Sequence, residues 1–498
     1  MAVVNKVFGP PGSGKTTHLL GVVDRELAEG VSSLKIGYFS FTRKAAIEAK
    51  ERAIVKFPGL NEKTDFPYFR TLHSLAFHCL SVHRDDMMQP LNYKEFALEA
   101  GIELSLSQEE EDVAVLKADN PILNEINLAR IRGTDLKEHY NQSGLDIEWH
   151  HFEFVDRTYR HYKNSRSLLD FTDLLELVVQ EADALPMLEV LIIDEAQDLS
   201  RLQWDMVNAL VQRSKRVFIA GDDDQAVFVW AGADVKSFLA FNGSVTVLEQ
   251  SYRVPVRVHA LAENIVQRIQ ERQPKTWRPR DFDGSVMTYS RFEDVTIDDG
   301  EWLVMASTNY LLNPIHEWFK STGLLFERGG VNSLPISVTK AIADWERLRL
   351  GQSIGEGAVR NVYRYLGTDF IAKGHKGFKK GLPDMVYNHA ELCLDHGLLT
   401  TLVWNEALTK ISDNNREYFM AVLRRGRRFS PVRLSTIHGA KGGEADNVLL
   451  LMDLSAKFSK EYAVNSDNLN RLFYVGVTRT KKALHLVLPR NEERGFRL

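Results

Sequence analysis

Short apolar runs alternate with amphipathic stretches over the N-terminal part of the chain, up to about Leu80. The runs Val3–Phe8 and Ile36–Phe41 have the length of strands, and the segment Lys44–Val55 after the second run has a helical period. Strands that alternate with helices favour a parallel sheet, because each helix carries the chain back to the start of the next strand. This pattern predicts an α/β fold.

Two long segments interrupt this alternation. Residues 81–166 are polar with a helical period, and residues 329–428 repeat that change later in the chain. Strand-like runs return after each segment, so we expect two α/β cores, each with a mainly helical insertion. Residues 1–80 and 167–247 would form the first core around insertion 81–166, and residues 248–328 and 429–498 the second core around insertion 329–428.

The loop after the first predicted strand has the composition of a phosphate-binding loop. Glycines let successive backbone N–H groups turn towards phosphate oxygens, a lysine adds a cation, and a threonine hydroxyl can bind Mg²⁺. The following helical pattern would present its positive end to the same anion. The alternative is a glycine-rich turn without a ligand, which the complete spacing disfavours. The predicted nucleotide contacts are Gly9, Pro10, Pro11, Gly12, Ser13, Gly14, Lys15, Thr16 and Thr17.

Two further strands end in polar residues suited to phosphate chemistry. Asp194 and Glu195 follow an apolar run; we expect Asp194, with Thr16, to hold Mg²⁺ and Glu195 to polarise the water that attacks the γ-phosphate. Acidic surface residues after a strand would give the same string by accident. Gln225 follows the other strand and is placed to sense the γ-phosphate or to orient water.

Composition narrows the class of protein only slightly. The chain has 498 residues, a hydrophobic fraction of 44% and a net charge of −5, so nucleic-acid binding would depend on local basic clusters. Its two cysteines are too few for a disulfide framework or a cysteine-based zinc site and suit a reducing compartment. Without a long apolar run or a signal pattern, we expect a cytoplasmic protein that does not enter membranes.

Motifs along almost the whole chain resemble, in order, the UvrD/PcrA/Rep family of superfamily 1 DNA helicases. Residues 194–198 match the family's DExQD signature, and residues 221–233 match its GDxDQ segment, which ends in an aromatic residue and Gly-Ala. Residues 41–46, 71–74, 170–175, 250–253, 307–309, 436–442 and 473–479 resemble further family motifs in the family's order.

The resemblance implies two RecA-like parallel-sheet P-loop domains (1A and 2A), with insertions 1B and 2B, that hydrolyse ATP with Mg²⁺ between them. Arg253 and Arg479 resemble the two arginines that reach the γ-phosphate, where a planar cation stabilises developing charge. Buried structural ion pairs are the alternative for both. Arg43 and Glu444 fall among the family's nucleotide contacts, with Glu444 at the ribose.

The resemblance also implies a path for single-stranded DNA. Hydroxyls and imidazoles donate hydrogen bonds to phosphates, and aromatic faces accept any base, so we expect binding without sequence preference. Each residue could instead cap a local turn, and aromatic residues at this density more often belong to a core. The expected contacts are Phe41, Thr42, Thr71, His73, Phe228, Trp230, Asn309, Thr436 and His438.

Several departures from the family pattern leave questions open. The first strand starts within a few residues of Met1, without the adenine-recognition segment, so the preference for ATP over other triphosphates is open. Ala231 stands where relatives often have arginine, and that contact is either lost or supplied elsewhere. Gly443 and Ala445 replace larger apolar residues beside Glu444. The basic stretches 373–380 and 424–428 would contact duplex DNA or only solvent.

The sequence thus predicts an ATP-dependent 3′–5′ translocase and helicase, monomeric on single-stranded DNA and at single-strand/duplex junctions. It would be a compact, phage-type form of the family, because insertion 329–428 is short. Two alternatives remain: a DNA-stimulated ATPase that displaces proteins without strong unwinding, and a nucleotide-dependent subunit of a repair or defence complex.

Overall fold

A computed structural model describes residues 2–41, 43–57, 59, 61, 64–104, 120–298, 300–375, 378, 385–425 and 431–498, without the side chains of 43–45 and 48. The chain divides into two compact units. The first comprises Met1–Asp283 with Glu461–Thr478 and Leu498, and the second comprises Gly284–Lys460 with Arg479–Arg497.

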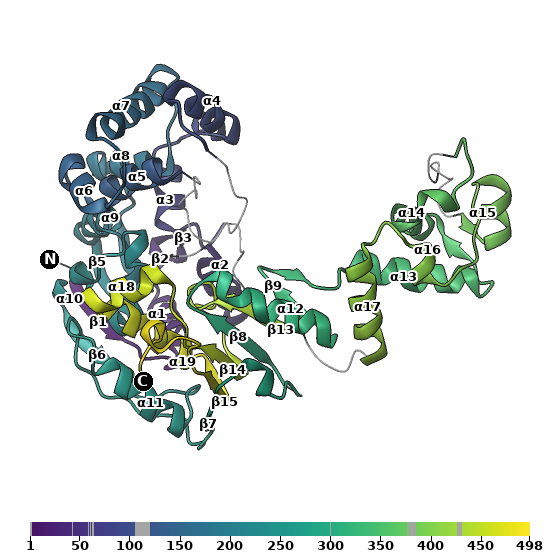
Figure 1. The fold of residues 1–498 in the computed structure, drawn as a ribbon. Coiled ribbons are helices and arrows are strands. Elements are labelled where there is room, and N and C mark those ends of the chain that lie inside the picture. The colour runs from purple at the N-terminus through teal and green to yellow at the C-terminus, as the bar shows by residue number, and fades with distance from the viewer. Residues whose placement is uncertain are drawn as a thin grey trace. The chain divides into compact units, whose positions relative to one another are not determined.

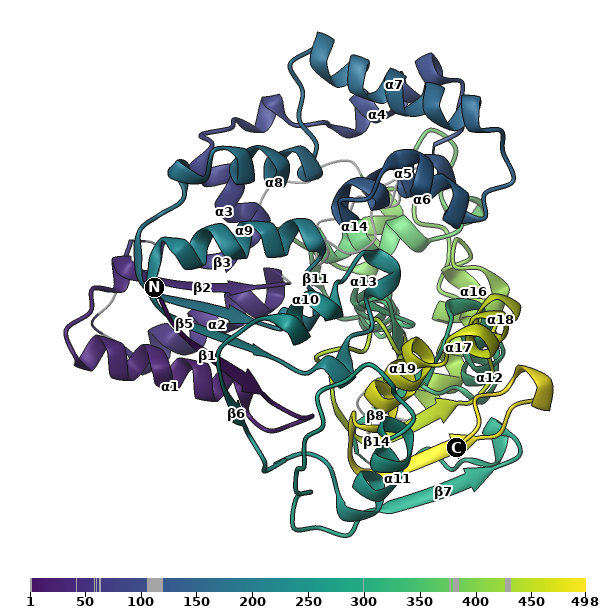
Figure 2. The same ribbon diagram turned by 90° about the vertical axis from the view of Figure 1, so that its left-hand side faces the viewer.

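The first unit is built on a parallel sheet of six strands, which Figure 2 shows with helices on both faces. All of its strand pairs are parallel, as the alternation of strands and helices predicts. In spatial order the strands are β3 (Phe69–Thr71), β2 (Ile36–Ser40), β4 (Leu188–Asp194), β5 (Ser214–Gly221), β1 (Val3–Phe8) and β6 (Ser244–Val247).

Alternate residues of each central strand enter separate cores on the two faces of this sheet. Phe8, Leu191 and Ile219 belong to one buried cluster, whereas Val7 and Ile192 belong to another. This follows from the two-residue period of a strand, and burial of both faces explains the nearly continuous apolar runs. The helices of this unit outside the insertion are α1 (Lys15–Ala28), α2 (Arg43–Lys56), α3 (Leu72–Cys79), α8 (Phe171–Gln180), α9 (Arg201–Gln212), α10 (Val235–Ala240), α11 (Val256–Val266) and α19 (Asp467–Val477).

The first helical insertion packs its own aromatic core and is joined to the sheet-bearing core by buried ion pairs. Arg130 and Lys163 of the insertion pair with Asp170, the N-cap of α8, at 2.7 and 2.6 Å. Burial alone would raise the pKa of Asp170, but these two cations hold that pKa well below its usual value. The insertion's helices are α4 (Pro90–Ala100), α5 (Pro121–Arg132), α6 (Leu136–Ser143) and α7 (Trp149–Ser165) (Figure 1).

The second unit contains a seven-stranded sheet, parallel except for its β9–β10 pair. Its strands, in spatial order, are β10 (Val331–Asn332), β9 (Phe326–Arg328), β13 (Val432–Thr436), β8 (Trp302–Ala306), β14 (Ala445–Leu451), β15 (Thr480–Val487) and β7 (Ser285–Tyr289). Its further elements are α12 (Asn313–Thr322), α13 (Ile336–Arg349), β11 (Ile354–Gly355), α14 (Glu356–Tyr365), β12 (Val386–Tyr387), α15 (His389–Asp395), α16 (Trp404–Ala407), α17 (Asp413–Arg425) and α18 (Ala456–Val464), which extends past Lys460.

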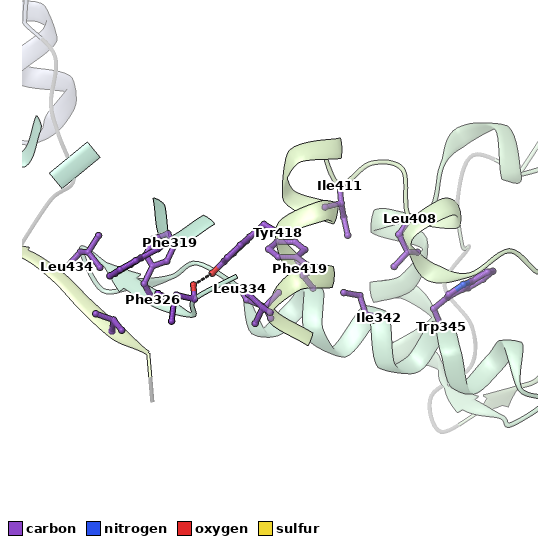
Figure 3. Close-up of a cluster of buried hydrophobic side chains, with 14 of the residues drawn as sticks. Phe319, Phe326, Leu334, Ile342, Trp345, Leu408, Ile411, Tyr418, Phe419 and Leu434 are labelled. Carbon is purple, nitrogen blue, oxygen red and sulfur yellow. Dashed lines mark hydrogen bonds between the residues drawn. The ribbon is translucent and has the colours of Figure 1, made fainter. Parts of the chain in front are cut away.

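The helices of the second insertion share one continuous core with this sheet. Leu434 on β13, Phe326 on β9 and Trp345 on α13 belong to the same buried cluster, part of which Figure 3 shows. Helix α13 turns one apolar face to this core, because its residues Val338, Ile342, Trp345 and Leu348 are all buried. This insertion is therefore not an independently cored domain.

The α/β class and the strands read from the sequence are confirmed. The predicted run Val3–Phe8 is β1 residue for residue, and the predicted run Ile36–Phe41 matches β2 within one residue. Short strands β10 to β12 lie in the segment expected to be mainly helical. Among the described residues, no helix combines the length and the hydrophobicity that a membrane crossing requires.

We expect Arg130→Met to loosen the first insertion. Arg130 is 8% exposed and pairs with Asp170, which is 5% exposed, so the substitution leaves a buried carboxylate undercompensated. The cost should be about 3–5 kcal/mol in the opening free energy of α5 and α7, measured by amide hydrogen exchange. Arg166→Met is the control because Arg166 is 40% exposed and its partner Glu99 is 42% exposed, so it should cost less than about 1 kcal/mol. Equal effects of the two substitutions would contradict this assignment.

Candidate nucleotide and single-strand sites

The loop between β1 and α1 has the backbone geometry that phosphate binding needs. Gly12 and Gly14 have φ angles of 71° and 78°, in the left-handed region that glycine adopts without strain. Gly14 is the N-cap of α1 and carries no capping side chain, so the positive end of this helix is left for an anion. Lys15 folds back over the loop, and its Nζ donates to the Gly9 carbonyl at 2.8 Å.

A segment distant in sequence donates hydrogen bonds to two backbone carbonyls of this loop. Ser251 Oγ donates to the Pro11 carbonyl at 2.7 Å, and the Tyr252 N–H donates to the Gly12 carbonyl at 2.9 Å. A Cβ on Gly12 would lie 2.4 Å from Cβ of Arg253, so the close approach depends on glycine. Arg253 therefore lies beside the loop within the first unit, although residues 248–328 were expected to belong to the second core, and its role towards the γ-phosphate stays a prediction.

Two oxygen donors converge where a metal ion would bind. Thr16 Oγ1 donates to Asp194 Oδ2 at 3.2 Å, and Tyr38 Oη donates to the same oxygen at 2.6 Å. Burial raises the pKa of Asp194 to about 6, and the adjacent Glu195 adds to that rise. The ionised form of Asp194 is costly without a nearby positive charge, so a bound cation would stabilise it.

The residues present fit a nucleotide with Mg²⁺. Ser13 Oγ is buried in the loop with no hydrogen-bond partner among the described residues, as expected of a group that awaits a ligand. Thr16 and Asp194 would hold Mg²⁺, and the loop amides with Lys15 would hold the phosphates. Pro10, Pro11 and Thr17 lie in or beside the same loop, whereas the side chain of Arg43 is outside the described residues.

Glu195 has a backbone conformation that is unusual for its residue type. Its φ of 53° lies in the left-handed region, which costs a non-glycine residue on the order of 1–3 kcal/mol. Gln197 Nε2 donates to Glu195 Oε2 at 2.6 Å and so orients the carboxylate. This hydrogen bond fixes one oxygen of the Glu195 carboxylate, and the role of Glu195 in activating water stays a prediction.

Gln225 lies on the next strand end within the same unit. It is 6% exposed, and its Nε2 donates to Asp222 Oδ2 at 2.6 Å. The amide of Gln197 connects this strand end to Glu195, because the Asp222 N–H donates to Gln197 Oε1 at 3.0 Å. The structure thus brings Glu195 and Gln225 into one hydrogen-bonded network.

Arg479 and Glu444 belong to the second unit. Arg479 is 2% exposed, and its Nη1 donates to the Gly443 carbonyl at 3.4 Å. The Glu444 carbonyl accepts a hydrogen bond from Arg433, and its side chain is 42% exposed beside Lys481. The two predicted residues therefore lie near each other at the start of β14, and their roles towards the nucleotide stay predictions.

Three of the predicted DNA contacts line one pocket of the first unit. Phe41, His73 and Phe228 border it, together with Asp198 and Phe171. The rings of Phe41 and Phe228 stack with centroids 5.3 Å apart, and Trp230 next to them is 55% exposed. Burial lowers the pKa of His73 to about 4, so its imidazole is neutral at neutral pH and can donate one hydrogen bond.

The other predicted DNA contacts differ in exposure and in hydrogen bonding. Thr71 caps α3 by accepting from the Ser74 N–H, and Thr436 accepts from the Gly439 N–H, so both threonines have the capping role that was the alternative. Asn309 is exposed, and His438 lies half-buried with its ring 6.4 Å from that of Phe458.

Some predicted contacts fall outside what the structure describes. Thr42 is one of them, as are Lys376, Lys379, Lys380 and residues 426–428 of the basic stretches. Within those stretches, the described residues Lys373, Arg424 and Arg425 are exposed. At the turn where Ala231 replaces arginine, Arg132 of α5 donates to the Val229 carbonyl at 3.1 Å.

Comparison with known families gives the same assignment for both parts of the chain. Residues 2–246 match the UvrD/REP helicase N-terminal domain, and residues 412–491 match the UvrD-like helicase C-terminal domain. The chain belongs to the UvrD/PcrA/Rep-like helicases of superfamily 1.

Two relatives of this UvrD-like chain are PcrA helicases of bacteria. The ATP-dependent DNA helicase PcrA of Bacillus subtilis (strain 168) is 29% identical over 303 residues, which are 56% of this chain and 40% of the relative. The PcrA of Leuconostoc citreum is 26% identical over 344 residues, covering 64% of this chain and 44% of the relative. The matches thus cover less than half of the length of these relatives.

One solved structure aligns along nearly the whole UvrD-like chain. The DNA complex of arterivirus nonstructural protein 10 (helicase) covers 98% of this chain and 62% of its own, at 12% identity and a TM-score of 0.35. That similarity is too low to support an argument about fold or function.

The sequence pattern missed several residues that shape the sites of this UvrD-like chain. Tyr38 lies inside the apolar strand run Ile36–Phe41, where nothing in the pattern indicates a hydrogen bond to Asp194. Ser251 and Gln197 belong to recognised motifs, but no role followed from their residue types. Lys275 carried no signal, because its partners are distant in sequence.

We expect Tyr38→Phe to weaken Mg²⁺ binding. The substitution removes the hydroxyl that donates to Asp194 Oδ2 but keeps the ring that stacks on Phe69, with centroids 5.3 Å apart. Loss of one hydrogen bond to a charged group should raise the Mg²⁺ concentration for half-maximal ATPase activity roughly 3- to 10-fold. Tyr68→Phe is the control, because it removes a hydroxyl outside this network. An unchanged Mg²⁺ requirement in Tyr38→Phe would show that the hydroxyl does not support the metal ligand.

Proposed function

We propose that this chain is an ATP-driven motor that moves 3′ to 5′ along single-stranded DNA and separates duplex ahead of it. Family membership and the nucleotide-type loop support ATP hydrolysis, and the names of the PcrA relatives support DNA as the track. The 3′–5′ direction rests on family resemblance.

The observation that carries this proposal is the position of Gln197 between the two sites. Its Nε2 donates to Glu195 Oε2 at 2.6 Å on the nucleotide side and to Asp198 Oδ2 at 3.2 Å, and Asp198 lines the aromatic pocket. Gln197 is fully buried, so its amide cannot move without disturbing both partners. A motor needs such a connection between hydrolysis and grip on the strand.

A second short segment makes the same connection. Gln225 donates to Asp222 and so belongs to the hydrogen-bonded network that contains Glu195. Phe228, three residues later, lines the aromatic pocket and stacks on Phe41. A small displacement at Gln225 is therefore passed through three peptide units to an aromatic platform for bases. An ATPase with no DNA-linked work would not require either connection.

The chain's own residues divide the chemistry between them. Lys15 and the loop amides bind the phosphates, Glu195 accepts a proton from the attacking water, and Arg253 lies beside Gly12 to stabilise negative charge. Mg²⁺, when bound, screens the phosphate charge. Exclusion of water is favoured by the burial of Asp194 and Gln225 at the same sheet edge.

Paired unwinding assays test this proposal. We expect a duplex with a 3′ single-stranded tail to be separated in the presence of ATP, and the matched 5′-tailed duplex to remain intact. Separation of only the 5′-tailed duplex would refute the direction. DNA-stimulated ATPase activity without separation of either duplex would favour the protein-displacing ATPase, for which the short second insertion is the specific argument.

Glu195→Gln should abolish hydrolysis and spare nucleotide binding. The amide keeps the size of the side chain but cannot accept a proton, so we expect kcat to fall at least about 100-fold. Binding of a fluorescent ATP analogue should stay within about twofold of wild type. Glu189→Gln on the same strand is the control, because Glu189 pairs with Lys215 at the surface. ATPase turnover near the wild-type rate in Glu195→Gln would refute the assigned base.

A further inference from the structure

Three consecutive aspartates are buried at the end of β5. Asp222, Asp223 and Asp224 are at most 1% exposed, and their carboxylates lie within 4.8 Å of one another. Such a group would repel itself strongly in a medium of low dielectric constant. The cluster therefore needs a counter-charge, and its donor set alone would suit a metal ion.

A lysine supplies that charge. Lys275 Nζ lies 3.0 Å from Asp222, 2.7 Å from Asp223 and 2.6 Å from Asp224, and its side chain is 1% exposed. Burial alone would lower the pKa of Lys275, but the three aspartates raise it above its usual value, so the lysine stays charged. The ammonium group occupies the place where a metal ion would otherwise lie.

The three aspartates do not depend on Lys275 equally. Asp224 also pairs with Arg272 at 2.7 Å, and Asp223 also accepts from the Gln273 N–H at 2.7 Å. Asp222 has Lys275 as its cation, near Oδ1, and accepts from Gln225 Nε2 through Oδ2 at 2.6 Å. Lys275 thus lies beside one oxygen of this carboxylate as an ion-pair partner without a hydrogen bond, and Gln225 donates a hydrogen bond to the other oxygen.

We propose that Lys275 is a positioning residue that holds Gln225, through Asp222, in the orientation required for ATP hydrolysis. This inference rests on the proposed function, because Gln225 matters only if the chain hydrolyses ATP. Without the lysine, Asp222 would be an uncompensated buried carboxylate, which would turn, take up a proton or recruit water. Each of these changes alters the acceptor that orients the Gln225 amide.

The backbone around Lys275 has anchors of its own. The Asp467 carboxylate of α19 accepts from the Gln270 and Glu271 N–H groups at 3.0 Å each, and Arg471 Nε donates to the Asp223 carbonyl at 3.0 Å. Neutralising the lysine side chain therefore leaves its loop attached to α19. A loss of activity after this change can therefore be attributed to the position of Lys275 and not to detachment of its loop.

The test compares Lys275→Met with wild type in DNA-stimulated ATP hydrolysis. We expect kcat to fall about 10-fold or more, while KM for ATP and binding of a fluorescent ATP analogue stay within about twofold, because the phosphate-binding loop is untouched. Lys236→Met is the matched control: Lys236 pairs with Glu271 nearby, but its side chain is 77% exposed, and its kcat should equal that of wild type. Wild-type kcat in Lys275→Met would overturn the inference.

A double-mutant cycle tests whether Lys275 acts through Gln225. We expect Gln225→Ala and Gln225→Ala/Lys275→Met to have the same kcat, because the second change has nothing left to position. Multiplicative losses would overturn the inference. A wild-type chain without DNA-stimulated ATPase activity would instead refute the proposed function itself.

A charge-balanced variant covers the case in which Lys275→Met does not fold. Asp223→Asn/Lys275→Met removes one negative and one positive charge together, so the cluster keeps its net charge. We expect it to fold and to keep a low kcat, because Asp222 still lacks its cation. Recovery of wild-type kcat would show that Lys275 only balances charge, and failure of this variant to fold would show that the lysine is required for the fold itself. Either result would overturn the positioning role.

Discussion

The buried amide of Gln197 is the contact on which the functional part of the first unit depends. Its NH₂ group donates to Glu195 and Asp198, and its carbonyl accepts from the Asp222 N–H. One side chain thereby joins the carboxyl ends of β4 and β5. The contact also requires glycine at 221, since a Cβ there would lie 2.5 Å from Gln197 Oε1.

Two clusters of buried charge in the first unit are each compensated by at least one cation that is distant in sequence. Arg130 and Lys163 neutralise Asp170 where the insertion meets the core, and Lys275 neutralises the aspartates after β5. Replacing such networks by apolar residues is often no worse for stability, so they are weak evidence of stabilisation. Their directional hydrogen bonds do, however, specify one arrangement of the groups next to the two sites.

The phosphate-binding loop shows how a local motif and distant contacts combine. Its glycines allow the loop's backbone conformation, and hydrogen bonds from Ser251 and Tyr252 to the loop carbonyls stabilise that conformation. The corner that would hold Mg²⁺ likewise combines motif residues with a residue from outside the motifs. Thr16 and Asp194 belong to motifs, whereas Tyr38, which donates to the same carboxylate oxygen, comes from the interior of β2.

The sequence by itself determined the α/β class and most of the strands, and it located the loop that is predicted to bind nucleotide. Those features are local: apolar runs follow strand periodicity, and the loop Gly9–Thr16 acts through its own backbone and side chains. Only the tertiary structure decided how Gln197 joins two strand ends, that Lys275 lies among three aspartates, and that the second insertion shares its core with a sheet. These contacts join residues far apart in the chain, and no periodicity or spacing encodes which distant side chain compensates a buried charge.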